Sequence, residues 1–270
     1  MRGSPHEQQT RDDRANSLYP IRVGDVISPN TSDLIVLHAG PLNEWPNIGS
    51  MSAGTIGGCL ASMKAKYQAD PVAAVRGQGF IKELHQFLAN QFDALLLPAA
   101  RKQGITVEQE ATLFGSHKPK DVDVAVIHPV NGPLLVVGVR SQMSSVGKNV
   151  LTYYQDIVGE CISLQDRFPL ATYGYAYLHP LKSPEGSSLD HERYSRMYGS
   201  ISGRDGRNYR DVKGVYDQFA YLIVDFDSNP PGLRDDLLTP DDGLDLSIST
   251  FVPRMISTFK RRNIWLDVFA

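Results

Sequence analysis

Apolar and polar positions are most clearly ordered in the middle of the chain, where two short apolar runs flank a turn. The runs cover residues 122–127 and 134–139, and the segment between them contains Asn131-Gly132. An Asn-Gly pair between two apolar runs is a strong signal for a tight turn. The sequence therefore predicts a β-hairpin with its two strands side by side.

Polar residues extend both strands of this hairpin at the end away from the turn. Side chains alternate along a strand, so Asp121 and Asp123 share one face of the first strand. By the same rule, one face of the second strand carries Gly138, Arg140 and Gln142. Two carboxylates opposite a cation and an amide can hold a divalent metal and a phosphate. The alternative is a half-exposed hairpin edge whose charges serve solubility.

Helical or alternating spacing of apolar residues predicts elements in the rest of the chain. The expected helices cover residues 52–68, 80–95, 151–164 and 249–260. The expected strands outside the hairpin cover residues 33–38, 105–114, 171–178 and 220–226. Residues 179–210 are polar and without a clear period, so we expect a long loop there, of the kind that is often functional.

Composition is that of a globular protein. The chain has 270 residues, 41% of them apolar and 21% charged, and a formal net charge of −3. No stretch approaches the roughly 20 apolar residues of a membrane span, so we expect a cytoplasmic protein with no membrane partner. Because the chain is not strongly basic, any nucleic-acid binding must be local. We expect a disordered segment at 1–19, a helical or irregular extension at 20–70 and one domain at 71–270.

The order of elements from residue 71 is helix, three strands, helix and strand. This order resembles the core of the PD-(D/E)xK nuclease superfamily, and the resemblance covers residues 71–178. It implies a fold of the α/β (α+β) class, with a mixed central sheet flanked by helices as in restriction endonucleases. The segment RSQMSSVGKN also resembles a stretch found in restriction-endonuclease-like bacterial proteins.

The resemblance assigns roles to individual residues. Asp123 matches the metal-binding Asp of the second strand, with Asp121 as the alternative. Glu83 matches the Glu that often comes from the first helix, and Gln142 matches a Gln seen in some branches of the family. The (D/E)-x-K triplet falls on Gly138-Val139-Arg140, so the acid is missing and the Lys is Arg. Arg140 can stabilise a phosphate but, because the pKa of a guanidinium lies far above neutral pH, it does not readily trade protons.

Another carboxylate must replace the acid that Gly138 lacks, or the metal site is incomplete. Glu108 or Glu110 on the first strand is the favoured donor, with Glu110 preferred as a metal ligand. Asp156 and Glu160 on the following helix lie opposite its apolar stripe and are expected to face solvent.

The resemblance implies a bacterial, metal-dependent DNA endonuclease of type II restriction kind, which hydrolyses phosphodiester bonds in double-stranded DNA. Asp123, Arg140, Gln142 and Glu83 would be its catalytic residues, Mg²⁺ or Mn²⁺ its cofactor, and a homodimer its simplest assembly. The alternative is a nuclease-like domain that has lost catalysis and binds DNA or assembles with partners. A third reading is an unrelated α/β protein with a charged hairpin.

Contacts to DNA are expected in two places. Residues near the hairpin would touch the DNA backbone, and the polar segment 179–210 would read bases through its arginines. The expected backbone contacts are Lys118, Lys120, Ser144, Lys148 and Asn149, and the expected base-reading residues include Arg193, Arg196, Arg204 and Arg207.

Overall fold

The computed structural model describes residues 54–71, 79–184, 186–206, 212–240 and 243–270, all within the compact unit Asn47–Ala270. The predictions of a disordered segment at 1–19 and of a strand at 33–38 lie outside the described residues.

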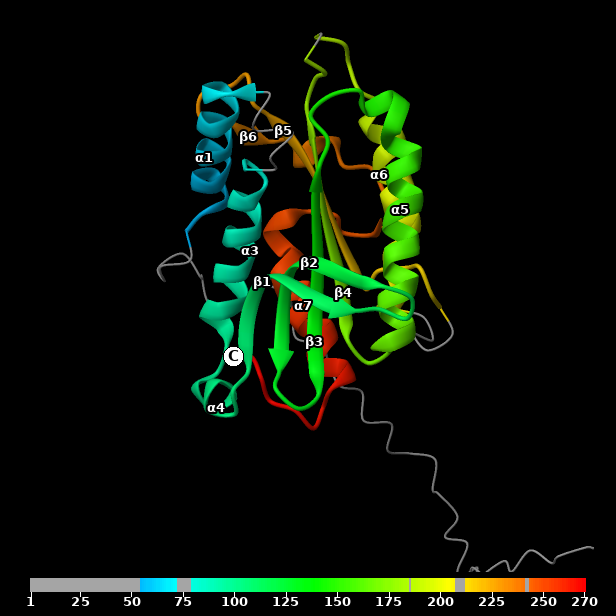
Figure 1. The fold of residues 1–270 in the computed structure, drawn as a ribbon. Coiled ribbons are helices and arrows are strands. Elements are labelled where there is room, and N and C mark those ends of the chain that lie inside the picture. Colours follow the sequence, from blue (N-terminus) through cyan, green and yellow to red (C-terminus); the bar gives the residue numbers. More distant parts are fainter. Residues whose placement is uncertain (1–53, 72–78, 185, 207–211, 241–242) are drawn as a thin grey trace, which may run out of the picture. The chain divides into compact units, whose positions relative to one another are not determined.

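A six-stranded mixed sheet forms the centre of the unit, as predicted (Figure 1). Its strands lie in chain order, with β3, β4 and β5 parallel and the remaining neighbours antiparallel. The predicted hairpin is confirmed, and Gly132, which directly follows its turn, has a φ of +77°. The strands are β1 (Thr106–Phe114), β2 (Pro119–His128), β3 (Gly132–Ser141), β4 (Thr172–Pro180), β5 (Gln218–Asp225) and β6 (Gly232–Leu233).

Helices cover both faces of this sheet. One face packs with α1, α3 and α7 into one apolar core, and the other packs with α5 and α6 into a second (Figure 1). Strand β4 is buried along its whole length because it lies between these two layers. The helices are α1 (Ile56–Ala69), α3 (Lys82–Leu95), α4 (Pro98–Lys102), α5 (Val146–Arg167), α6 (His191–Ser200) and α7 (Ile248–Arg262).

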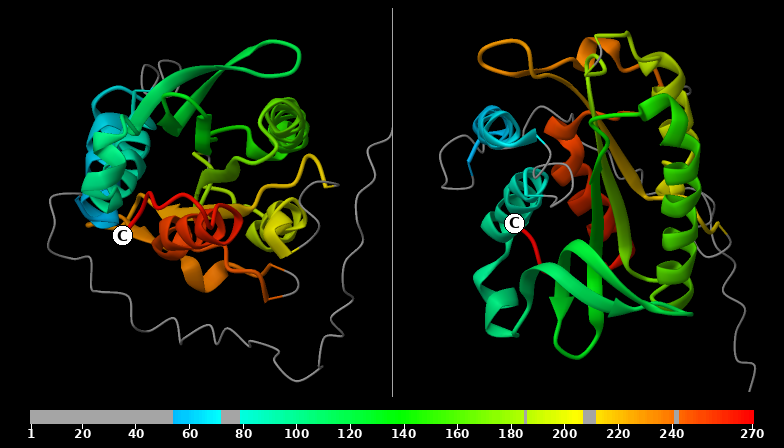
Figure 2. Two further views of the ribbon diagram at one scale, coloured as in Figure 1. Left: turned by 90° about the horizontal axis from the view of Figure 1, so that it is seen from below. Right: turned by 45° about the horizontal axis from the view of Figure 1, so that its top comes forward.

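The β1–β2 hairpin extends beyond the sheet and reaches α5 (Figure 2). At its tip the amide of Ser116 donates to the carbonyl of Ser163 on α5, at 3.0 Å. Leu113 and Val122 of the hairpin are buried in the same apolar core as α5. The hairpin is therefore held on α5 by apolar packing as well as by a backbone hydrogen bond.

The expectation of a loop throughout 179–210 is wrong, because α6 lies inside this segment. The side chain of Asp190 accepts a hydrogen bond from the amide of Arg193 at 3.1 Å and so caps the start of the helix. The buried side of α6 carries Tyr194 and Tyr198 where most helices carry aliphatic residues. The buried positions also include His191 and Ser195, so no continuous apolar period marks this helix in the sequence.

Candidate functional site

A cleft of about 620 Å³ opens where β2 separates from β3. The two strands pair from Val124 and Val137 toward the hairpin turn. One residue further from the turn, the side chain of Asp123 takes the place of a strand partner and accepts the amide hydrogen of Val139 at 2.5 Å. Residues of β1, β2, β3 and α5, together with the loop 142–145, line the cleft. The fork between the strands thus creates the space and aims a carboxylate into it.

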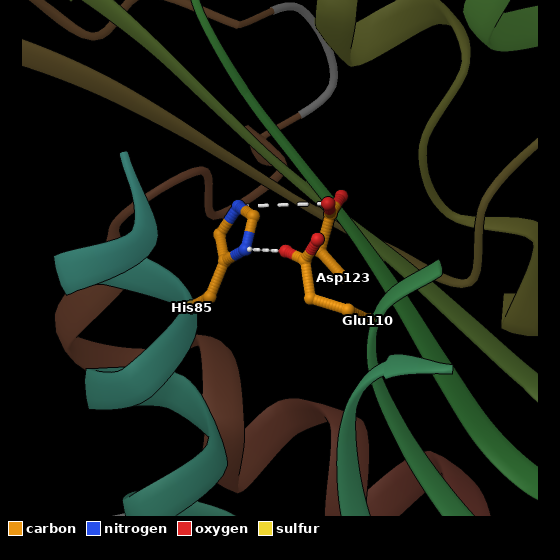
Figure 3. Close-up of side chains that lie close together, drawn as sticks. All are labelled: His85, Glu110 and Asp123. Atoms are coloured by element: carbon orange, nitrogen blue, oxygen red, sulfur yellow. Dashed lines mark hydrogen bonds and ion pairs between the residues drawn. The ribbon is translucent and has the colours of Figure 1, made fainter. Parts of the chain in front are cut away.

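Three potential metal ligands meet at this fork (Figure 3). His85 from α3 lies with Nδ1 2.9 Å from Oε1 of Glu110 and with Nε2 3.5 Å from Oδ1 of Asp123. One ligand atom from each of the three side chains lies within 4.8 Å of the others. The imidazole is 1% exposed, whereas Glu110 is 48% exposed. One nitrogen and two carboxylate oxygens from three different elements can bind a divalent cation together.

The backbone around the cleft is strained at two points. Glu110 and Ser145 have φ values of +54° and +53°, and they are the non-glycine residues of the described chain with positive φ. Both line the cleft. Glu110 lies opposite Asp123, since Gln109 pairs with Val124 and Ala111 with Val122. Unfavourable backbone conformations of this kind concentrate at functional sites, where they direct particular side chains.

Burial changes the protonation of the cluster. It raises the pKa of Asp123 to about 7; the charges of Glu160 and Glu110 also raise it, while the Val139 amide and Arg140 lower it. Burial also lowers the pKa of His85, against the opposing effect of Glu110. At neutral pH the imidazole is therefore a neutral, ligating base, and a cation would compete with a proton for Asp123.

Arg140 and Gln142 line the same cleft as Asp123. The guanidinium of Arg140 lies over the Tyr153 ring, 4.9 Å from its centroid, and its Nη1 is buried without a hydrogen-bond partner. The side-chain amide of Gln142 donates a hydrogen bond to the backbone carbonyl of Ser145 at 3.1 Å. Arg140 thus keeps donor capacity for an anion, whereas Gln142 supports the loop that leads into α5.

The position of the family's triplet acid is filled by an aromatic ring. A Cβ atom at Gly138 would overlap the ring of Tyr175 from β4. The space beside Gly138 is therefore not open to another carboxylate. The carboxylates of the cluster come instead from β1 and β2. Of Glu108 and Glu110, the two acids expected on the first strand, Glu110 belongs to the cluster.

Glu83 is directed away from the cleft. It accepts a hydrogen bond from Ser62 at 2.8 Å and pairs with Lys66, both on α1. The hydrogen bond from Lys66 is the main reason why the pKa of Glu83 is lowered. His85, two residues further on, lies on the buried side of α3 beside Leu84 and is the residue of this helix that meets Glu110 and Asp123. The position of His85 next to the apolar stripe was the available signal in the sequence.

The two acidic residues of α5 differ in exposure. Asp156 is 58% exposed, as expected, and lies 3.9 Å from Nη1 of Arg140. The prediction that Glu160 faces solvent is wrong, because it lines the cleft and accepts a hydrogen bond from Lys120 at 2.9 Å. Asp121 is exposed at the rim, outside the three-ligand cluster, and accepts from Thr112 at 2.5 Å.

Some of the residues expected to bind DNA lie in the cleft, and others lie outside it. Lys120, Ser144 and Asn149 line the cleft, while Lys118 and Lys148 are exposed outside it. Arg193 and Arg196 are exposed on α6.

Arg204 contradicts the prediction that it reads bases. It is 1% exposed, and its Nε lies 3.5 Å from Oδ1 of the buried Asp217. A side chain enclosed in this way supports the core and does not reach a ligand at the surface. Arg207 lies outside the described residues.

A scan of protein-family models, a search of curated proteins and a search of solved structures each found no match to this chain. The resemblance to PD-(D/E)xK nucleases therefore stays a prediction from the sequence. Among the described residues, no helix has the length and apolar character needed to cross a membrane.

Proposed function

We propose that the chain is a metal-dependent endonuclease that hydrolyses phosphodiester bonds in double-stranded DNA. The observation that carries this proposal is the convergence of His85, Glu110 and Asp123 at the fork between β2 and β3. The order of elements and the position of Asp123 on the second strand, which resemble the nuclease superfamily, support the same conclusion.

The donor set suits Mn²⁺ better than Mg²⁺. Magnesium prefers an all-oxygen shell, whereas an imidazole nitrogen raises the relative affinity for transition metals. In this cluster His85 supplies the nitrogen and the two carboxylates supply negative charge. A cation bound there would act as a Lewis acid on a phosphate oxygen and on a nucleophilic water. Arg140, whose Nη1 makes no hydrogen bond, would bind the same phosphate.

Two assays test this proposal directly. The first measures binding of Mn²⁺ and Mg²⁺ by calorimetry, and the second measures cleavage of long DNA of mixed sequence with each metal. Asp123→Asn should weaken Mn²⁺ binding at least tenfold and abolish cleavage. Asp121→Asn is the matched control, since this residue lies two positions away on the same strand and outside the cluster. Full cleavage by a folded Asp123→Asn protein would reject the assignment.

A nuclease-like module without catalysis is the second candidate. The Tyr175 ring beside Gly138 favours it, because this ring excludes the acid that the family places there. The same assays separate the two functions. A catalytically inactive module would bind Mn²⁺ or DNA and leave the DNA intact.

A homodimer remains part of the proposed function, because a chain with one cleft most simply cuts both strands of a duplex as a two-fold pair. Light scattering in the presence and absence of DNA tests it. A monomeric mass under both conditions would contradict it.

A further inference from the structure

A second charged pair lines the cleft beside the three-ligand cluster. Lys120 of β2 donates to Oε2 of Glu160 on α5 at 2.9 Å, and the two side chains are 25% and 16% exposed. Glu160 also lies close enough to Asp123 for its charge to affect that carboxyl group. The pair therefore belongs to the same electrostatic environment as the cluster.

The β1–β2 hairpin does not need this ion pair to stay packed on α5. Leu113 and Val122 already bury apolar surface in the core that they share with α5, and the Ser116 amide bonds to Ser163. A partly buried ion pair loses much of its attraction to the cost of removing both charges from water. A purely structural role thus leaves the position of the pair inside the cleft unexplained.

The two cations of the cleft differ in the chemistry they can perform. Arg140 is charged at every accessible pH. Burial acts to lower its pKa, but the neighbouring tyrosines and carboxylates raise it, so the pKa lies above its ordinary value. A lysine ammonium can lose and regain a proton and can therefore act as a general acid. Among the described residues that line the cleft, Lys120 is the one lysine.

We infer that Lys120 is the proton donor of the cleft and that Glu160 is the residue that positions it. This inference rests on the proposed nuclease function. When the oxygen of an attacking water bonds to phosphorus and the P–O bond to the leaving group breaks, the leaving oxygen takes a proton from Lys120. The water releases one proton to solvent, and Lys120 regains one from solvent, so the step is balanced as hydrolysis.

Four variants test the inference: Lys120→Arg, Lys120→Met, Glu160→Gln and the control Lys118→Met, which changes an exposed lysine outside the cleft. The readouts are kcat and KM on long DNA with Mn²⁺, the affinity for Mn²⁺ alone, and the thermal midpoint. Lys120→Arg keeps the positive charge beside Glu160 and should retain the wild-type midpoint and Mn²⁺ affinity. It should nevertheless lose at least about 100-fold in kcat, the usual contribution of general acid catalysis.

Glu160→Gln removes the carboxylate that positions Lys120, so it should lower kcat, by less than Lys120→Arg does, and leave KM and the Mn²⁺ affinity at their wild-type values. A merely structural pair would show the opposite pattern, with a wild-type kcat in both Lys120→Arg and Glu160→Gln. Wild-type cleavage together with a fully active Lys120→Arg overturns this inference alone. Absence of wild-type cleavage with either metal overturns the proposed function and this inference together.

Discussion

The raised pKa of Asp123 predicts that the metal-free protein gains stability when this residue is replaced by Asn. The carboxyl group has a pKa of about 7 in the folded protein, against 3.8 for an unperturbed Asp. This difference corresponds to about 4 kcal/mol of unfolding free energy at 1.36 kcal/mol per pH unit. Because 26% of the side chain is exposed, water offsets part of this cost, and we expect about 2 kcal/mol.

The sign of the effect follows from the two protonation states. Below pH 3.8 both the folded and the unfolded chain hold the proton, so the carboxyl group does not penalise folding. As the pH rises to about 7, the unfolded chain loses the proton first, and the folded state is progressively destabilised. Asn carries no charge and can still accept the amide hydrogen of Val139. The gain of Asp123→Asn should therefore be largest above pH 7 and disappear toward pH 4.

Urea unfolding between pH 4.5 and 8.5 in the presence of a chelator measures this gain. Asp121→Asn is the control, and as a surface change it should stay within about 1 kcal/mol of wild type at every pH. Added Mn²⁺ should reverse the order, since it stabilises only the protein that retains its ligand. An Asp123→Asn protein that is no more stable than wild type at pH 8 without metal would refute the reasoning.

Three further predictions concern the core and the strand beside the cleft. Asp217→Ala should lower the unfolding free energy by about 3 to 5 kcal/mol, because it removes the buried carboxylate that lies 2.6 Å from the buried guanidinium of Arg262; urea unfolding measures this, and a loss below 1 kcal/mol would contradict it. Burial lowers the pKa of His179 from 6.5 to about 3. The protein should therefore have its full unfolding free energy above pH 6.5 and lose part of it as the pH drops toward 3, because the unfolded chain binds the proton first. This slope should be weaker in His179→Gln if calorimetric midpoints are followed across that range, and an equal slope would exclude His179 as its source. Gly138→Ala should destabilise the fold by about 1 to 3 kcal/mol, because the new Cβ atom would overlap the Tyr175 ring. A second change, Tyr175→Leu, should relieve part of this loss. If Gly138→Ala unfolds at the same urea concentration as wild type, the ring moves aside easily.

Much of the fold could be predicted because its signals are local. The apolar runs beside Asn131-Gly132 and the stripe of α3 report burial on one or two faces, and the structure confirms the elements they predict. Helix α6 could not be predicted in this way, because its buried side mixes tyrosines with His191 and Ser195 and so carries no continuous apolar period.

The candidate site was predicted only in part because it depends on contacts between distant segments. The alternation rule brings Asp123, Arg140 and Gln142 to one place, and they line one cleft. The rule does not apply to helix α3, where the resemblance pointed to Glu83, whereas His85 is the residue that meets the strands. Nor can the rule show that β1 adopts a positive φ at Glu110, or that the ring of Tyr175 fills the space beside Gly138.

The unequal exposure of the three ligands gives the cluster a direction of entry. His85 is fixed in the core by a packed helix, whereas nearly half of the Glu110 side chain is in contact with solvent. A cation held between them would arrive and depart from the cleft, on the side of Glu110 and Asp123, because the histidine side is closed. Truncation of Glu110 should therefore accelerate metal exchange more than it weakens equilibrium binding, while replacement of His85 should chiefly change which metal is preferred. One side chain would govern the kinetics of the centre and the other its selectivity.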